Sequence, residues 1–183
     1  MNTYHISTII SSSSGSSRTF KGVFARDQFV NQEIVFPGLY VFNTDNINQA
    51  GSHWVAAYFS KEQKCEYFDS YGIAPLFDDV INKFLSIDNS FVCNQHILQS
   101  FNTNVCGIYC IIYSVMKCKG YDLHKIIDLF LTTANDDERD HVLRYFIDFN
   151  FPLIISEFGR VPSIHDVGAS SLQICKLKAK NLH

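Results

Sequence analysis

The sequence predicts an α+β fold, in which a small mixed, mostly antiparallel β-sheet is surrounded by helices and one buried central helix carries a cysteine. Short runs with strand composition are concentrated between residues 39 and 69. An unbroken apolar run from Ile108 to Met116 follows a polar, turn-prone segment. Helical patterns then fill most of the chain up to residue 149. This order of elements is typical of an α+β domain.

Length and composition predict one globular domain over residues 1–183. A chain of 183 residues is long enough for one well-buried core and short for two. The net charge of −3 gives no electrostatic reason to expect nucleic acid or an acidic membrane as the main partner. No apolar stretch reaches membrane-spanning length, and the N-terminus lacks a signal-peptide pattern. We therefore expect a soluble intracellular protein with reduced thiols.

The first part of the chain is expected to contain an irregular start followed by strands. Residues 1–10 mix polar and apolar side chains, which fits a short strand or a loose arm. The serine-rich residues 11–17 predict a flexible loop. Strand composition marks three runs, residues 39–43, 53–59 and 65–69. The short connection between the last two runs predicts a hairpin.

The rest of the chain is expected to be mainly helical. Pro75 opens a helix with apolar residues on one face, and residues 90–98 return as a strand. After the central helix, two more helices are predicted over residues 123–133 and 136–149. Residues 160–183 lose this periodicity and are expected to form a C-terminal tail.

The central helix is predicted over residues 105–118, with Cys106 in its first turn. Residues 102–104 offer side chains suited to an N-cap, and Gly120 is a C-terminal stop signal. A thiol in the first turn feels the positive end of the helix dipole, which lowers its pKa and favours the nucleophilic thiolate. The alternative is that Cys106 is one more small buried hydrophobe, and this stretch alone does not decide between the two.

Two other residues are expected to meet at one edge of the sheet. His53 starts one strand and Asp69 ends the next, so antiparallel pairing places imidazole and carboxylate side by side. The carboxylate would fix the tautomer of the imidazole, and the imidazole would take up the proton of Cys106. Gln99, seven positions before Cys106, could stabilise an oxyanion together with the backbone N–H of Cys106.

Each of these residues also has a plain structural interpretation. His53 fits a half-exposed strand end, Asp69 a turn, and Gln99 a hydrogen bond within a loop. Each of these interpretations is the more common one for a single residue. The four residues at mutually compatible positions favour a Cys-His-Asp triad with a Gln oxyanion hole.

Three motifs resemble the adenain-type cysteine proteases. These are the adenovirus maturation protease and its relatives in virophages, Polinton/Maverick elements and large DNA viruses. The wider clan includes the SUMO- and NEDD8-deconjugating proteases. The resemblance covers about residues 20–120. The motifs are Gly51-Ser52-His53-Trp54, Tyr67-Phe68-Asp69-Ser70-Tyr71-Gly72 and Gln99-x6-Cys106-Gly107.

The resemblance implies roles for six residues. It implies that His53 is the base, Asp69 its orienting partner and Cys106 the nucleophile. It implies that Gln99 belongs to the oxyanion hole. Two further roles concern substrate: Trp54 would line a narrow channel that favours glycine near the scissile bond, and Asp27, within Phe20-x-Gly22-Val23-x-x-x-Asp27, would contact substrate.

The chain also departs from the adenovirus protease. That enzyme has Glu in place of Asp69, is basic, and is stimulated by DNA and by a short peptide linked through a cysteine. Because this chain is mildly acidic, a DNA cofactor is disfavoured. No cofactor is required for the chemistry, and an activating peptide stays open. Cys93 fits either a cofactor-linking thiol or, as the favoured alternative, a buried structural cysteine. The basic, strand-like residues 171–178 are expected to add to a sheet edge in place of such a peptide.

The leading hypothesis is a monomeric cysteine endopeptidase that cleaves viral capsid or core precursor proteins at glycine-containing sites. Its expected location is the virion and the cytoplasm or nucleus of the host cell, without secretion. One alternative is a deconjugating protease for a ubiquitin-like modifier. A second is an inactive scaffold that binds glycine-rich tails. A zinc-binding structural domain is disfavoured, because the six cysteines show no C-x-x-C and no zinc-type spacing with histidine.

Overall fold

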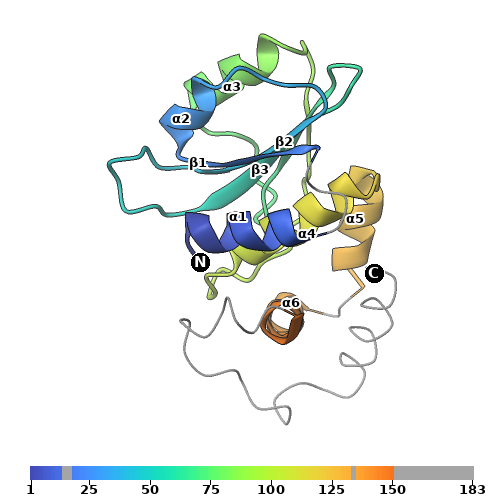
Figure 1. Cartoon of the computed structure of the whole chain (residues 1–183). Helices are drawn as coiled ribbons and strands as arrows, with labels where there is room; N and C mark the ends of the chain where they lie inside the picture. Colours follow the sequence, from blue (N-terminus) through green and yellow to red (C-terminus); the bar gives the residue numbers. More distant parts are fainter. Residues whose placement is uncertain (14–17, 133–134, 151–183) are drawn as a thin grey trace.

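A mixed five-stranded sheet forms the centre of the described structure, which is a computed structural model that describes residues 1–13, 18–132 and 135–150 (Figure 1). The strands follow the order of the chain: β1 (Phe20–Phe24), β2 (Gly38–Asn43), β3 (Trp54–Phe59), β4 (Cys65–Phe68) and β5 (Val92–Cys93). The helices are α1 (Thr3–Ser12), α2 (Arg26–Val30), α3 (Asp78–Leu85), α4 (Cys106–Cys118), α5 (Leu123–Phe130) and α6 (Asp136–Asn150). The α+β class predicted from the sequence is confirmed.

The sheet is antiparallel in its centre and parallel at both margins. β3 pairs antiparallel with β2 and with β4. β1 pairs parallel with β2, and β5 pairs parallel with β4. α2 lies in the connection from β1 to β2, and α3 in that from β4 to β5. Each of these long connections carries the chain back, so that the second strand starts at the same end as the first. The short β3–β4 loop instead reverses the chain direction. The predicted hairpin is therefore present, and the strand expected over residues 90–98 is only two residues long.

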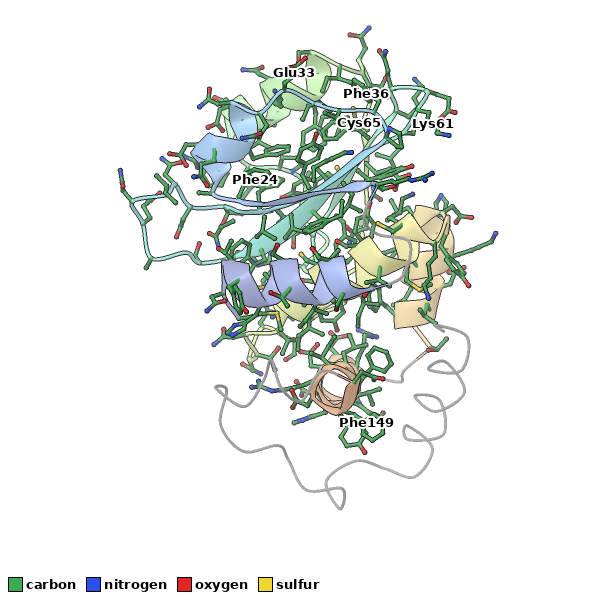
Figure 2. The ribbon with its side chains drawn as sticks, in the orientation of Figure 1. Phe24, Glu33, Phe36, Lys61, Cys65 and Phe149 are labelled. Carbon is green, nitrogen blue, oxygen red and sulfur yellow. The ribbon has the colours of Figure 1, made fainter. Side chains whose placement is uncertain are left out.

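Helices cover both faces of the sheet and bury two separate apolar clusters. α2 and α3 lie on one face, and α1 and α4 lie on the other (Figure 1). The α2/α3 side is aromatic: Phe29 stacks on Phe42 with ring centroids 4.1 Å apart, and Phe36 and Cys65 pack in the same cluster (Figure 2). The α4 side is mainly aliphatic. Burial on both faces explains why the strands are continuous apolar runs.

The predicted central helix is present as α4, and its cap differs from the prediction. Ten of its residues are buried, as its uniformly apolar sequence requires. The N-cap is Val105, without a side-chain cap bond, so the prediction that residues 102–104 cap the helix is wrong. Thr103 instead donates its hydroxyl to the carbonyl of Ser100 and to the carboxylate of Asp140. The N-cap residue of α4 thus supplies no side-chain hydrogen bond to the first turn.

The N-terminal segment is a helix, so the prediction of a strand or loose arm over residues 1–10 is wrong. Asn2 caps α1 by accepting a hydrogen bond from the backbone N–H of His5 at 3.0 Å. Ile6, Ile9 and Ile10 have the spacing of one helical face and are fully buried against the α4 side of the sheet. Residues 11 and 12 of the predicted loop belong to α1, which continues to Ser12, and residues 14–17 of that loop lie outside the described residues.

The other helices follow the sequence closely. α3 begins at Asp78, three residues after the predicted start at Pro75, and α5 and α6 confirm the two C-terminal helices. Within the described residues, no helix combines the length and apolarity that crossing a bilayer requires. The tail over residues 160–183 and the edge strand over residues 171–178 lie outside the described residues.

Candidate active site

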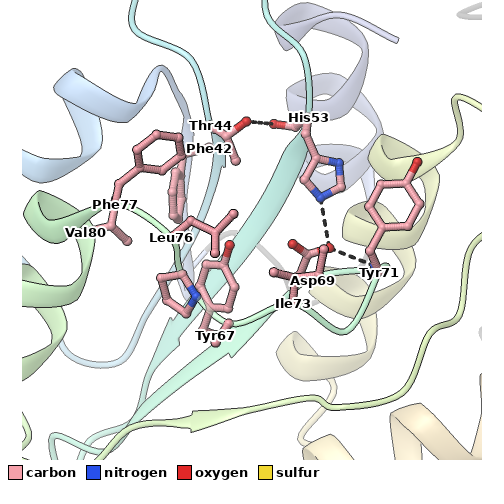
Figure 3. A pocket seen from close by; sticks show the side chains of 12 residues that line it. Phe42, Thr44, His53, Tyr67, Asp69, Tyr71, Ile73, Leu76, Phe77 and Val80 are labelled. Carbon is pink, nitrogen blue, oxygen red and sulfur yellow. Dashed lines mark hydrogen bonds and ion pairs between the residues drawn. The ribbon is translucent and has the colours of Figure 1, made fainter. Parts of the chain in front are cut away.

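The end of the β3–β4 hairpin brings His53 and Asp69 together. His53 immediately precedes β3 and Asp69 immediately follows β4, and the pairing of Ala56 with Phe68 sets the register. The Nε2 atom of His53 lies 2.9 Å from Oδ1 of Asp69 (Figure 3). Both side chains are largely buried, at 17% and 6% exposure. A hydrogen bond shielded in this way fixes the ring orientation more firmly than an exposed one.

Asp69 is itself held by its neighbours. The backbone N–H of Tyr71 donates to Asp69 Oδ1 at 2.8 Å. Asn94, just after β5, accepts from the Asp69 backbone N–H at 2.8 Å and donates its Nδ2 to the Asp69 carbonyl at 2.7 Å. The side chain of Asn94 therefore makes the two hydrogen bonds to the Asp69 backbone that a neighbouring strand would make. The sequence analysis missed Asn94, although a buried Asn inside a predicted strand is unusual enough to have been a signal.

Cys106, the first residue of α4, completes the group. His53 stabilises the thiolate of Cys106 through hydrogen bonding and charge. Burial alone would raise the pKa of the Cys106 thiol. Hydrogen bonds from His53 and from the backbone N–H groups of Trp54 and Gly107, together with the charge of His53, outweigh burial and hold that pKa below its ordinary value.

The pKa of His53 moves in the opposite direction. Burial would lower it, but the hydrogen bonds to Asp69 and Cys106 and the negative charges of both residues raise it to about 9. A lowered thiol pKa beside a raised imidazole pKa favours a thiolate–imidazolium pair at neutral pH. The structure thus brings together the three residues of the predicted triad, and their catalytic roles stay a prediction.

The other cysteines in the described residues are held as neutral thiols. They are Cys65, Cys93, Cys110 and Cys118, and none of them forms a disulfide. Burial raises the pKa of Cys65, Cys93 and Cys118 to about 11 and that of Cys110 well above its ordinary value. Cys93 is half-buried, so its use as a cofactor-linking thiol stays untested. Among the described residues, no cluster of three or more His, Cys, Asp or Glu could hold a metal ion.

Gln99 lies beside the site with its side-chain amide fully used. It is completely buried, and its Oε1 accepts from the hydroxyl of Ser70 at 2.8 Å. Its Nε2 donates to the Thr103 carbonyl at 2.8 Å and to the Tyr71 hydroxyl at 3.1 Å. The predicted oxyanion role therefore requires a substrate oxygen to replace the Tyr71 hydroxyl as an acceptor of the Gln99 amide.

The loop that carries Gln99 is fastened by α6. The carboxylate of Asp140 accepts hydrogen bonds from the backbone N–H of Ser100 at 3.0 Å, from the hydroxyl of Tyr109 at 2.6 Å, and from the hydroxyl of Thr103. These bonds tie α4, α6 and the loop together at a buried point. Sequence reasoning missed Asp140, because the acidic start of α6 has a sufficient explanation in the helix dipole.

Tyr71 is a third residue that the sequence analysis left without a role, after Asn94 and Asp140. Its ring packs on the imidazole of His53, with centroids 5.0 Å apart, and its other neighbour is Phe101 at 5.1 Å. Figure 3 shows the tyrosine ring alongside the imidazole. The packing limits the rotation of His53. Gly72, with a φ of +67°, makes the tight turn that follows, in close contact with the backbone of His96.

The two predicted substrate contacts have different surroundings. Trp54 adjoins Cys106 through its backbone, while its indole Nε1 donates to the carbonyl of Met1 at 3.2 Å. Gly107 is packed so closely that a Cβ there would meet Met1 and Ile6 at 3.2–3.3 Å. Asp27 accepts from the backbone N–H of Ile47 at 3.0 Å, so its observed contact fastens the loop between β2 and β3. Substrate binding by either residue stays a prediction.

Several solved structures are similar to this chain, and two of them are described below. No protein-family model matches the chain, and no curated protein matches it. The chain is similar to the central domain of the uncharacterized protein Lpg1148 from Legionella pneumophila, with 20% identity, a TM-score of 0.52, and coverage of 85% of this chain and 97% of that domain. It is also similar to the ASFV pS273R protease, with 25% identity and a TM-score of 0.37 over 56% of this chain and 41% of the protease. The first likeness shows a shared fold.

Proposed function

We propose that the protein is a cysteine endopeptidase with Cys106 as nucleophile. The observation that carries the proposal is the opposite displacement of two pKa values within one hydrogen-bonded group: the thiol of Cys106 is made more acidic and the imidazole of His53 more basic. Displacements of this kind cluster at catalytic sites. The other described cysteines show the reverse displacement, so acidity is confined to the thiol that meets His53 and Asp69.

The geometry supports a two-step hydrolysis. The Cys106 thiolate attacks the peptide carbonyl carbon and forms a tetrahedral oxyanion. Its negative charge is stabilised by the backbone N–H of Cys106, which lacks an intrahelical acceptor, and by the Gln99 amide hydrogen that now points to Tyr71. As the C–N bond breaks, the His53 imidazolium gives its proton to the leaving amine. Water then attacks the thioester, His53 takes up its proton, and the acid product and free thiolate are released.

Two features support viral structural precursor proteins as substrates, with cleavage at glycine-containing sites. The motifs around His53, Asp69 and Cys106 resemble those of viral maturation proteases. Trp54 directly follows His53 and adjoins Cys106 through its backbone, which places this residue beside the proposed nucleophile. In this proposal the enzyme acts as a monomer in the virion and the host cell, and requires neither DNA nor a cofactor for its chemistry.

Trapping with an electrophile tests the proposal. The full chain is treated with a peptide that ends in a glycine-derived thiol-reactive group, and mass spectrometry locates the adduct. We expect stoichiometric labelling at Cys106, no labelling in Cys106→Ala, and at least tenfold slower labelling in His53→Ala. Cys118→Ala is the matched control and should be labelled like the wild type. Labelling spread over several cysteines and indifferent to His53 would contradict the proposal.

A second experiment separates the endopeptidase from a deconjugating protease. Glycine-containing peptides and folded conjugates of a ubiquitin-like modifier are offered at equal concentration. The endopeptidase proposal expects the peptides to be cleaved at least as efficiently as the conjugates. Faster cleavage of conjugates by tenfold or more would replace it with the deconjugating activity. Unchanged rates on addition of duplex DNA are expected, since the chain is mildly acidic.

A further inference from the structure

An open pocket adjoins the candidate active site on the α2/α3 side of the sheet. His53, Asp69 and Tyr71 form one of its walls (Figure 3). The opposite wall belongs to the aromatic cluster under α3, with Phe42 on β2 and Val80 on α3. Cys106 is on α4, which covers the other face of the sheet. The imidazole of His53 therefore has the nucleophile on one side and this pocket on the other.

The pocket has the size and chemistry of a site for one apolar side chain. Its volume is about 210 Å³. An apolar cavity of about 150 Å³ is large enough to bind benzene. Apart from His53, Asp69 and the hydroxyls of Thr44 and the two tyrosines, the lining is hydrocarbon, and Ile73 and Leu76 on its rim are 41% and 75% exposed. Large apolar side chains exposed together beside a polar site are typical of a binding surface.

The proposed chemistry fixes which part of a substrate passes this pocket. The imidazolium of His53 gives its proton to the leaving amine, so the chain that follows the scissile bond must lie against the imidazole. The part of the substrate before the scissile bond becomes the acyl group of the thioester on Cys106, at the N-terminus of α4. Because the pocket shares His53 and Asp69 with the reacting group, the residues nearest to it belong to the leaving segment.

We propose that this pocket binds a large apolar side chain, such as leucine or phenylalanine, at one of the first three positions after the scissile bond. This inference rests on the proposed endopeptidase function and adds a specificity on the leaving side. Leu76 and Ala74, on the segment before α3, are the specificity-determining residues, because both line the pocket and both are exposed. Glycine before the scissile bond and an apolar residue after it would together define the cleavage site.

Matched peptides test this pocket. A parent peptide with glycine before the scissile bond and alanine at the three following positions is compared with peptides that carry leucine or phenylalanine at one of them. We expect kcat/KM to rise at least tenfold at one position, which is the gain typical of filling an apolar subsite. The ratio to follow is kcat/KM for the leucine or phenylalanine peptide divided by kcat/KM for the parent peptide. This ratio should fall at least fivefold in Ala74→Phe, designed to fill the pocket, and in Leu76→Asp, which places a charge on its rim.

The control is a matched leucine elsewhere on the surface. Leu131 follows α5, is 40% exposed and does not line the pocket, so Leu131→Asp should leave the ratio at its wild-type value. A ratio near one at all three positions in the wild type would overturn the inference, as would an unchanged ratio in both pocket variants. If only the parent peptide's basal cleavage is seen, the pocket assignment fails and the peptidase stands.

A binding measurement covers the case in which no peptide is cleaved. In the full-length Cys106→Ala protein, the same peptides are titrated while the NMR amide signals of residues 73, 74, 76 and 77 are followed. We expect the leucine peptide to bind at least fivefold more tightly than the alanine peptide and to shift these signals. Equal binding, or shifts elsewhere only, would overturn the pocket inference. The absence of both cleavage and Cys106 labelling in the wild type would instead overturn the proposed function.

Discussion

Cys106 and Cys110 stand one turn apart on the same face of α4 and have opposite chemistry. Cys106 is half-buried at the helix N-terminus, and its thiol pKa is lowered by hydrogen bonds from His53 and two backbone N–H groups. Cys110 is fully buried, and its pKa is raised by burial and also by the negative charges of Cys106 and Asp69. The comparison teaches that a helix position alone does not activate a thiol. The partner at the strand end decides which of the two is a nucleophile.

The largest expected effect comes from removing the charge behind His53. Asp69→Asn should lower kcat by about 10³–10⁴-fold, because the ring loses both its orientation and the charge that stabilises the imidazolium. The pH profile should show in which direction the activity changes. In the wild type the imidazolium persists up to about pH 9, so activity should fall as pH rises through that value. In Asp69→Asn this alkaline limit should move to lower pH.

Steady-state kinetics from pH 5 to pH 10 measure this difference. Asp128→Asn, an exposed change on α5, is the control and should keep the wild-type profile. An alkaline limit that stays near pH 9 in Asp69→Asn would show that Asp69 does not govern the imidazole.

Gln99 is expected to have the next largest effect. Gln99→Glu keeps the shape of the side chain and its bond from Ser70 but replaces the donating amide, so kcat should fall about 10²–10³-fold. Tyr71→Phe removes only the hydroxyl that accepts from Gln99 in the resting structure, and should lower kcat less than fivefold. Single-turnover kinetics with one glycine peptide measure both variants. Equal large losses in both would assign the oxyanion donor to Tyr71.

A smaller contrast separates Cys106 from the other half-buried thiols. At pH 7, a thiol with a pKa of about 11 is ionised to roughly one part in 10,000. The higher nucleophilicity of a basic thiolate recovers about half of that difference on a logarithmic scale. Iodoacetamide should therefore alkylate Cys106 at least about 10²-fold faster than Cys93 or Cys118. Peptide mapping after timed quenching measures the three rates, and similar rates would remove the distinction between the two kinds of cysteine.

The smallest expected effect is that of Cys110→Ala. Removing one buried sulfur from the core should cost roughly 1–2 kcal/mol of unfolding free energy, which corresponds to a Tm lower by about 2–8 °C in a chain of this size. The labelling rate of Cys106 should stay at its wild-type value, because the bonds that lower its pKa come from elsewhere. Calorimetry and the labelling assay measure the two quantities. A changed labelling rate would mean that the two turns of α4 are coupled.

The hairpin and the central helix were predictable because their signals are local. Strand composition on either side of a short loop places His53 and Asp69 at one sheet end, whatever the rest of the fold does. The N-terminal helix was missed because ten residues of mixed polarity show only a weak helical period of apolar side chains. Its isoleucines are recognised as a buried face only once they pack in the same cluster as α4. The cap of α4 was misplaced because the hydroxyl of Thr103 donates to Asp140 on α6, which is 37 residues further along the chain and is brought close only by folding.

The sequence alone determined the β3–β4 hairpin, the buried character of α4 and the position of Cys106 in its first turn, since each depends on composition and spacing within a few residues. Only the tertiary structure decided that Asn94 holds Asp69, that Asp140 fastens the Gln99 loop, and that an apolar pocket opens beside His53. These features join segments that are distant in the chain. Their free energy depends on burial and on hydrogen-bond geometry, which no local pattern encodes.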